Sequence, residues 1–115
     1  MPRILLVDDD TAVRLVFLEI LFDAGYEVDT AHSFEAGNAI LETGHAFDLL
    51  ITDGRFTDGT GAALADMADA RGIPVLIVTG NPLEIGRAKY PVLAKPMRTG
   101  TLLSAVKAAL KGDAR

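Results

Sequence analysis

Hydrophobic residues occur along the chain in short unbroken runs, separated by longer stretches in which they recur periodically. Residues 4–7, 49–51 and 75–78 are apolar throughout. Runs of this length are typical of parallel strands that are buried on both faces. Residues 26–30 alternate between apolar and polar side chains, as an edge strand does, and residues 92–94 form a fifth short run. The pattern therefore predicts five strands.

The stretches between these runs show helical spacing. The first is expected to bury one face made of Val13, Val16, Phe17, Ile20 and Leu21, and to end at Gly25. Three further helices show the same spacing. The second helix should begin after an N-cap at Ser33 and bury Phe34, Gly37 and Leu41. The third should bury Leu64, Met67 and Ala68 and end at Gly72, and the last should bury Leu102, Leu103, Val106, Ala109 and Leu110. Alternating strands and helices predict a three-layer, doubly wound α/β fold with a parallel sheet. We expect residues 1–115 to form one domain, without an output domain.

The connection between the last two strands, residues 80–90, is short for a strand–helix–strand crossover, which takes about 10–12 residues. Asn81 and Pro82 suit an N-cap and a first helical position. The fourth helix should therefore have only about two turns.

Polar residues stand at the carboxyl end of each central strand. Asp8 and Asp9 follow the first strand, Asp53 the third, Thr79 the fourth and Lys95 the fifth. Because the carboxyl ends of parallel strands meet at one edge of the sheet, we expect all five side chains to converge there.

Together these side chains suit phosphoryl transfer. Carboxylates at close range repel one another, and a hard cation with oxygen ligands, Mg²⁺ above all, removes that conflict. Lys95 offers a positive charge to a phosphate oxygen, and Thr79 offers a hydroxyl group. Catalysis by such a group is positioning and charge neutralisation, with a carboxylate able to act as the nucleophile.

Composition narrows the function classes. The net charge of -5 argues against a nucleic-acid partner, and the absence of cysteine excludes disulfides and zinc–thiolate sites. No apolar run approaches the ~18 residues of a membrane span, and the N-terminus lacks the layout of a signal peptide. We expect a cytoplasmic protein without membrane or nucleic-acid contacts.

The ordered set of strand ends resembles the response-regulator receiver domains of two-component signalling. The matching pieces, within residues 4–110, are Leu6-Val7-Asp8-Asp9, Leu50-Ile51-Thr52-Asp53, Gly61, Val78-Thr79-Gly80 and Ala94-Lys95-Pro96. By this resemblance Asp8 and Asp9 hold Mg²⁺, and Asp53 is both phosphoacceptor and metal ligand. The backbone carbonyl of Arg55 is a further ligand. Thr79 contacts the phosphoryl group, and Lys95 pairs with it.

The resemblance also implies a flavodoxin-like strand order of 2-1-3-4-5 and a cis peptide at Lys95–Pro96. It implies a histidine kinase or histidine phosphotransfer protein as partner. The chain departs from the family in having Phe56-Thr57 where Met-Pro is usual and Val92 where an aromatic switch residue is common. We therefore predict that phosphorylation reorders residues 80–90 and does not rotate an aromatic side chain. Arg55, Asp58 and Asn81 are expected at the rim of the site, where they could tune phosphoryl lifetime.

The first helix carries a second apolar stripe, Leu15, Leu18 and Phe22, on the side predicted to face away from the core. Large apolar residues grouped on a surface are typical of an interface. We interpret the stripe as the docking face for the phosphodonor partner, with a homodimer as the alternative.

Two other functions remain open. Asp8-Asp9-Asp10 formally fits the Asp-x-Asp of haloacid-dehalogenase phosphatases, although that class needs a late acidic pair and leaves Asp53 unexplained. A pseudo-receiver that binds partners without being phosphorylated is the other alternative, and the complete set of five polar residues argues against it.

Overall fold

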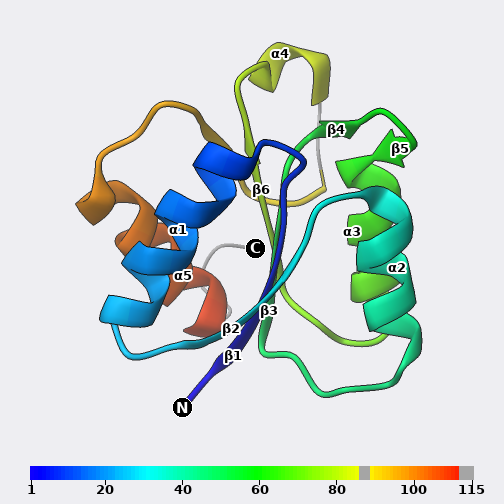
Figure 1. Ribbon diagram of the computed structural model, residues 1–115, viewed down its shortest axis with the longest axis horizontal. Coiled ribbons are helices and arrows are strands. Elements are labelled where there is room, and N and C mark those ends of the chain that lie inside the picture. The colour runs from blue at the N-terminus through cyan, green and yellow to red at the C-terminus, as the bar shows by residue number, and fades with distance from the viewer. Residues whose placement is uncertain (86–88, 112–115) are drawn as a thin grey trace.

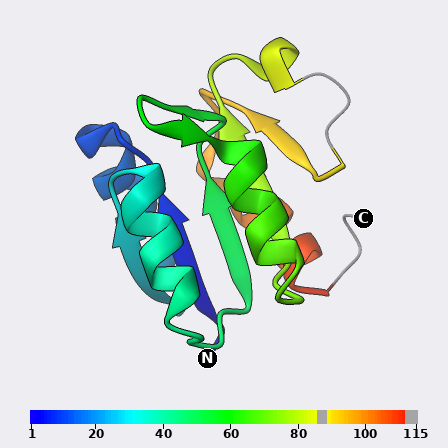
Figure 2. The same ribbon diagram turned by 90° about the vertical axis from the view of Figure 1, so that its right-hand side faces the viewer.

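The computed structural model describes residues 1–85 and 89–111, and residues 84 and 85 by their backbone alone. A parallel sheet is formed by β1 (Arg3–Val7), β2 (Glu27–Ala31), β3 (Leu49–Thr52), β6 (Val75–Thr79) and β7 (Val92–Ala94). The strand order is β2-β1-β3-β6-β7, which confirms both the predicted strands and the doubly wound order. Figure 2 shows the strands side by side behind two helices.

Helices cover both faces of this sheet, giving three layers (Figure 1). On one side lie α1 (Thr11–Asp23) and α5 (Thr99–Lys111), and on the other lie α2 (Phe34–Glu42) and α3 (Gly61–Asp69). Leu5 and Val7 of β1 point into the core beneath α2 and α3, while Ile4 and Leu6 point into the core beneath α1 and α5. The strand runs are apolar without interruption because successive side chains enter two different cores.

Local capping fixes where the helices begin and end. Ser33 accepts a hydrogen bond from the Ala36 N–H and Asp10 from the Val13 N–H, so both act as N-caps, and the cap at Ser33 was predicted. Gly25 and Gly72 adopt φ values of +95° and +75° just after α1 and α3. Only glycine takes up this left-handed conformation without strain, so these helices stop where expected.

The orientation of α1 differs from the prediction. Val16 was assigned to the core but is 54% exposed, whereas Leu18, assigned to the outer stripe, packs against the core. The buried stripe is centred on Phe17 and Leu21. Successive residues are ~100° apart around the helix axis, so Leu18 lies at the edge of this stripe and Val16 lies outside it. The large apolar side chains that α1 exposes are therefore Leu15, Val16 and Phe22, hereafter the α1 patch.

Two connections at the carboxyl edge of the sheet carry small elements. A hairpin of β4 (Arg55–Phe56) and β5 (Gly59–Thr60) joins β3 to α3, and it was not predicted. The helix α4 (Pro82–Ile85) follows β6 and begins at Pro82, as predicted; its four residues make about one turn, and the second turn expected there would fall on residues 86–88, outside the described residues. No helix in the described part of the chain is long and apolar enough to cross a membrane.

Candidate functional site

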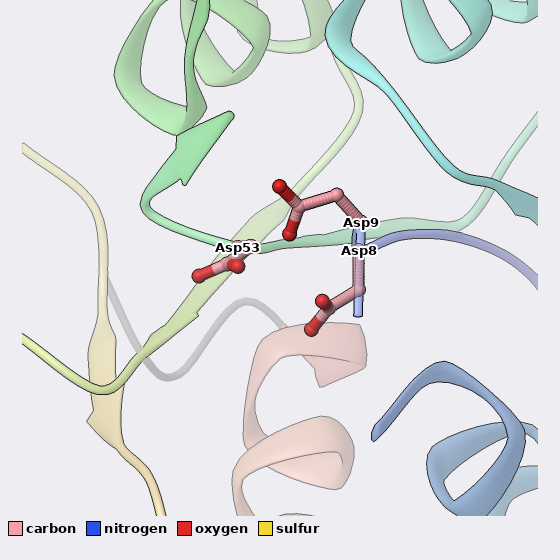
Figure 3. A group of neighbouring side chains, drawn as sticks. All are labelled: Asp8, Asp9 and Asp53. Atoms are coloured by element: carbon pink, nitrogen blue, oxygen red, sulfur yellow. The ribbon is translucent and has the colours of Figure 1, made fainter. Parts of the chain in front are cut away.

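Three carboxylates meet at the carboxyl edge of the sheet. Asp8 and Asp9 follow β1, Asp53 follows β3, and one oxygen of each lies within 4.8 Å of the others. The register of the sheet produces this meeting, because Val7 of β1 pairs with Thr52 of β3 and the Asp53 N–H donates to the Val7 carbonyl at 2.9 Å. Asp8 is buried, Asp53 is partly buried and Asp9 is exposed. Figure 3 shows the three side chains gathered at this edge.

Lys95 brings a positive charge to the same group. Its Nζ lies 2.8 Å from Asp8 Oδ2 and 3.7 Å from Asp53 Oδ2, so the ammonium bridges the two carboxylates. The Lys95 backbone N–H donates to the Thr79 carbonyl at 2.8 Å, which ties the end of β7 to the end of β6. The peptide between Lys95 and Pro96 is cis, as the family resemblance implied.

The turn that carries Asp8 and Asp9 is held by further hydrogen bonds. Asp8 Oδ1 accepts from the Asp10 N–H at 2.9 Å, and the Asp8 carbonyl accepts from the Arg14 guanidinium at 2.8 Å. Both carboxylate oxygens of Asp8 thus have a partner within the protein, the second being Lys95. Arg14 was missed at the sequence level because a guanidinium-to-carbonyl contact depends on one rotamer and leaves no pattern along the chain.

Asp53 is held in an environment that resists its ionisation. Burial raises its pKa above the ordinary value, and the nearby Asp8 and Asp9 charges raise it further. Lys95 acts against this rise, as does the Gly54 N–H, which donates to Asp53 Oδ1 at 2.7 Å. Additional positive charge at this point would favour the carboxylate form, which is the form needed for nucleophilic attack.

A cavity of about 380 Å³ opens above Asp53. Its lining residues are Asp9, Asp53, Arg55, Phe56, Thr57, Thr79, Gly80 and Asn81. Thr79 is 5% exposed, and its hydroxyl oxygen accepts from the Asn81 N–H at 3.1 Å. The cavity therefore brings together the predicted Asp9, Asp53 and Thr79 with the rim residues Arg55 and Asn81.

Asp58 is the predicted rim residue that lies elsewhere. It does not line this cavity. Its two carboxylate oxygens accept from the backbone N–H groups of Phe34 and Glu35 at the start of α2, each at 3.0 Å. The sequence could not indicate this role, because the partners are more than twenty residues away along the chain.

Gly61 determines how tightly the loop after Asp53 can close. Its N–H donates to the Gly54 carbonyl at 3.0 Å. A Cβ atom on Gly61 would overlap the Asp53 backbone carbonyl oxygen, which lies only 2.0 Å from the position that atom would take. The loop from Asp53 to α3 can therefore close back on the phosphoacceptor candidate only if residue 61 has no side chain.

The donor atoms fit a hard divalent cation. Carboxylate oxygens are the ligands that Mg²⁺ prefers, and it binds by one or two carboxylates while keeping several waters. Asp9 and Asp53 present carboxylates at the cavity, whereas both oxygens of Asp8 already have partners. Asp9 and Asp53 would thus be direct ligands, and Asp8 would act through water or after Lys95 moves.

Comparison with known proteins gives a consistent picture. The family model of the response regulator receiver domain matches residues 4–107. The alginate biosynthesis transcriptional regulatory protein AlgB of Pseudomonas aeruginosa is 41% identical over 81 residues, which make up 69% of this chain and 18% of AlgB. The transcriptional regulatory protein CpxR of Klebsiella pneumoniae is 30% identical over 120 residues, which make up 96% of this chain and 50% of CpxR. The chain thus spans half or less of these curated relatives.

Solved structures agree with the sequence comparison. A response regulator receiver protein from Sinorhizobium medicae superposes with a TM-score of 0.89 at 29% identity, covering 97% of this chain and 96% of that chain. The response regulator protein TrrA from Thermotoga maritima, solved in complex with Mg(2+)-BeF, gives a TM-score of 0.77 at 26% identity, covering 95% of this chain and 99% of TrrA.

Proposed function

The chain belongs to the response regulator receiver domain family, and on that premise we propose that it is a phosphorylation switch in which Asp53 accepts one phosphoryl group. The observation that carries this proposal is the convergence of Asp53 with Asp9 and Thr79 around one cavity, with Lys95 Nζ 3.7 Å from Asp53 Oδ2. Each of the four groups has a separate task in phosphoryl transfer.

In the proposed reaction an oxygen of Asp53 attacks the phosphorus atom of a phosphohistidine. A new P–O bond forms, the P–N bond to the imidazole breaks, and the imidazole leaves with the electron pair and takes up a proton. When bound, Mg²⁺ supplies positive charge that neutralises the phosphoryl oxygens. Asp9, Asp53 and the Arg55 carbonyl would hold it, with Asp8 orienting its waters.

Lys95 and Thr79 complete the site on the side of the phosphoryl group. Lys95 Nζ, now 3.7 Å from Asp53 Oδ2, is within a short movement of an oxygen on a phosphorylated Asp53. The Thr79 hydroxyl group would rotate away from the Asn81 N–H and donate to another phosphoryl oxygen. The Mg(2+)-BeF complex of the relative TrrA supports a site of this kind.

The decisive experiment is intact-mass measurement after incubation with acetyl phosphate, with and without Mg²⁺. We expect the mass of one phosphoryl group to be added, only with the metal, and no addition to Asp53→Asn. Asp9→Ala should require more Mg²⁺ for the same phosphorylation rate, because a hard cation loses an anionic ligand. Wild-type labelling that persists in Asp53→Asn would contradict the assignment of Asp53.

The intact-mass measurement, together with an assay of phosphate release, separates the alternatives. A pseudo-receiver would gain no phosphoryl group under any condition. A haloacid-dehalogenase-like phosphatase would instead release phosphate from a generic phosphate ester with many turnovers. The position of Asp53 beside Lys95 favours the phosphoacceptor over both.

Receiver domains act with histidine kinases or histidine phosphotransfer proteins, and we infer that such a partner docks on the α1 patch of this chain. Leu15, Val16 and Phe22 are 56%, 54% and 69% exposed. An apolar groove of about 330 Å³ is lined by Val16 and its neighbours in the first turns of α1 and, on the other side, by Lys95, Pro96 and Met97. A helix of the donor lying on this surface would bring its phosphohistidine close to Lys95 and Asp53.

A further inference from the structure

The turn of the β4–β5 hairpin is attached to α2 by one carboxylate. Asp58 Oδ1 accepts from the Phe34 N–H and Oδ2 from the Glu35 N–H, each at 3.0 Å. These donors belong to the first turn of α2, where helical N–H groups have no partner within the helix. Among the causes that keep the pKa of Asp58 below its usual range, the Glu35 N–H is the largest, and the Phe34 N–H acts in the same direction.

Packing reinforces this attachment. A Cβ atom on Gly59 would lie 2.6 Å from the ring of Phe34, so the hairpin and the first residue of α2 are in direct contact. Phe56 is 5% exposed and belongs to the core beneath α2 and α3. The hairpin has only two residue pairs, too few to be stable without such contacts.

The same hairpin forms part of the wall of the cavity above Asp53. Three consecutive residues, Arg55, Phe56 and Thr57, line that cavity and come directly before Asp58 in the chain. At its other end the hairpin is joined to Asp53 by Gly54, whose carbonyl accepts from the Gly61 N–H. The wall is thus fixed at one end by the Gly54–Gly61 closure and at the other by Asp58.

From this arrangement we infer that Asp58 is a positioning residue for the phosphorylation site: by holding the hairpin on α2, it fixes Arg55 and the cavity wall relative to Asp53. The inference rests on the proposed phosphorylation of Asp53. Asp58 acts at two steps. It keeps the Arg55 carbonyl in place for Mg²⁺, and it keeps Thr57 and Phe56 where they restrict the access of water to a phosphorylated Asp53.

The test compares Asp58→Ala with Ser33→Ala. Ser33 caps the same helix by accepting from the Ala36 N–H, so its removal weakens the start of α2 and leaves the hairpin bond intact. Mg²⁺ affinity is measured by calorimetry, and the decay of the phosphorylated protein by intact mass. We expect Asp58→Ala to weaken Mg²⁺ binding by up to about 10-fold, the low end for groups that support metal ligands, and to shorten the phosphoryl lifetime. Ser33→Ala should behave as the wild type in both.

A third variant guards against loss of folding. Asp58→Asn keeps one carbonyl oxygen that can accept one of the two bonds, so its Mg²⁺ affinity and phosphoryl lifetime should fall between those of the wild type and Asp58→Ala. Equal losses in Asp58→Ala and Ser33→Ala, or no loss in either Asp58 variant, would overturn the positioning role alone. A wild-type chain that neither binds Mg²⁺ nor gains a phosphoryl group would overturn the proposed function, and this inference with it.

Discussion

Asp53 is placed where its charge is unfavourable until a cation joins it, and this placement has a consequence for stability. Burial is the main cause that raises its pKa above the unfolded value of 3.8. The folded state therefore holds the Asp53 proton more tightly than the unfolded state does, and stability falls as the pH rises between the two pKa values. The destabilisation is complete above the folded pKa and absent below 3.8.

We predict that Asp53→Asn is more stable than the wild type at neutral pH without divalent cations. The difference should shrink as the pH falls and vanish below the unfolded pKa of 3.8, where both side chains are neutral. Urea unfolding at a series of pH values measures it. With saturating Mg²⁺ the order should reverse, because only the wild type keeps the Asp53 ligand. An Asp53→Asn variant less stable than the wild type at neutral pH without metal would show that burial does not dominate.

Gly61 provides a second prediction at the scale of one residue. Gly61→Ala should destabilise the protein by about 1–3 kcal/mol, the range for a forced overlap, and slow phosphorylation by acetyl phosphate. The cause is the Asp53 carbonyl, 2.0 Å from the position of the added Cβ. Gly100→Ala is the control, since an added Cβ there has no neighbour within 4 Å. Urea unfolding and intact mass measure the two effects, and equal behaviour of the two variants would contradict the role of Gly61.

The site residues that could be predicted from the sequence are those that directly follow a strand and so lie at the carboxyl edge of the sheet. An apolar run precedes each of these residues, which are Asp8, Asp9, Asp53, Thr79 and Lys95. Parallel pairing of the strands is enough to place the ends of these runs at one edge of the sheet. The roles of Arg14 and Asp58 could not be predicted, because each depends on a side chain reaching backbone groups that the folded chain brings near. Neither contact has a local pattern.

At the scale of elements, helix ends were more predictable than helix faces. The caps at Ser33 and Asp10 and the stops at Gly25 and Gly72 depend on neighbouring residues only. The face that α1 buries depends on how the helix packs against the sheet. The helix has apolar residues around most of its circumference, including Leu15, Val16, Leu18 and Phe22, so the sequence pattern did not determine which of them are buried. The β4–β5 hairpin escaped prediction because two-residue strands carry no periodicity.

The connection from β6 to β7 is the element through which we expect phosphorylation to be read. At its start the Thr79 hydroxyl accepts from the Asn81 N–H. At its end Tyr90 donates to Asp66 of α3 at 2.6 Å, and Lys89 pairs with Asp69 at 3.1 Å. The start of the connection therefore depends on the hydroxyl group that the phosphoryl group would recruit, while its end is attached to α3.

We predict that phosphorylation loosens the Tyr90–Asp66 bond as residues 80–90 reorder. The chain has two tyrosines and no tryptophan, so Tyr26→Phe makes Tyr90 the only strong fluorophore. A phenol bonded to a carboxylate is quenched, so its emission should rise when Mg²⁺ and beryllium fluoride are added. Asp66→Asn in the same background should be bright from the start and change little.

Hydrogen exchange provides an independent measurement of the same change. Amides of residues 80–85 and 89–90 should exchange faster in the phosphorylated state, since weakly packed segments open most easily. Unchanged emission together with unchanged exchange in a protein of confirmed phosphoryl mass would show that the switch is read elsewhere.

The whole molecule keeps its site and its expected docking surface adjacent. α1 begins right after the acidic pair, with Asp10 as its N-cap. The groove lined by Val16 and Lys95 therefore lies next to the cavity above Asp53, because Lys95 Nζ is 3.7 Å from Asp53 Oδ2. From this groove the α1 patch extends along the helix to Phe22. Burying three large apolar side chains at ~25 cal/mol per Å² gives several kcal/mol, much of it offset by the cost of association. The small net binding free energy that results suits a partner that must dissociate after phosphoryl transfer.

The last prediction separates docking from chemistry. The double variant Leu15→Ser with Phe22→Ser should slow phosphoryl transfer from a histidine phosphotransfer protein that phosphorylates the wild type by at least about 10-fold, which corresponds to 1.4 kcal/mol of lost binding. Labelling by acetyl phosphate should stay at the wild-type rate, because the cavity is untouched. Leu83→Ser is the matched control, since Leu83 is 94% exposed but lies on α4.

Sedimentation of the wild type and the double variant shows whether the patch also joins two copies of the chain. If transfer from the protein donor is unchanged and both proteins have the same mass in solution, the α1 patch is not an interface. If both labelling rates fall together, the substitutions have altered the site itself, and docking is not the cause.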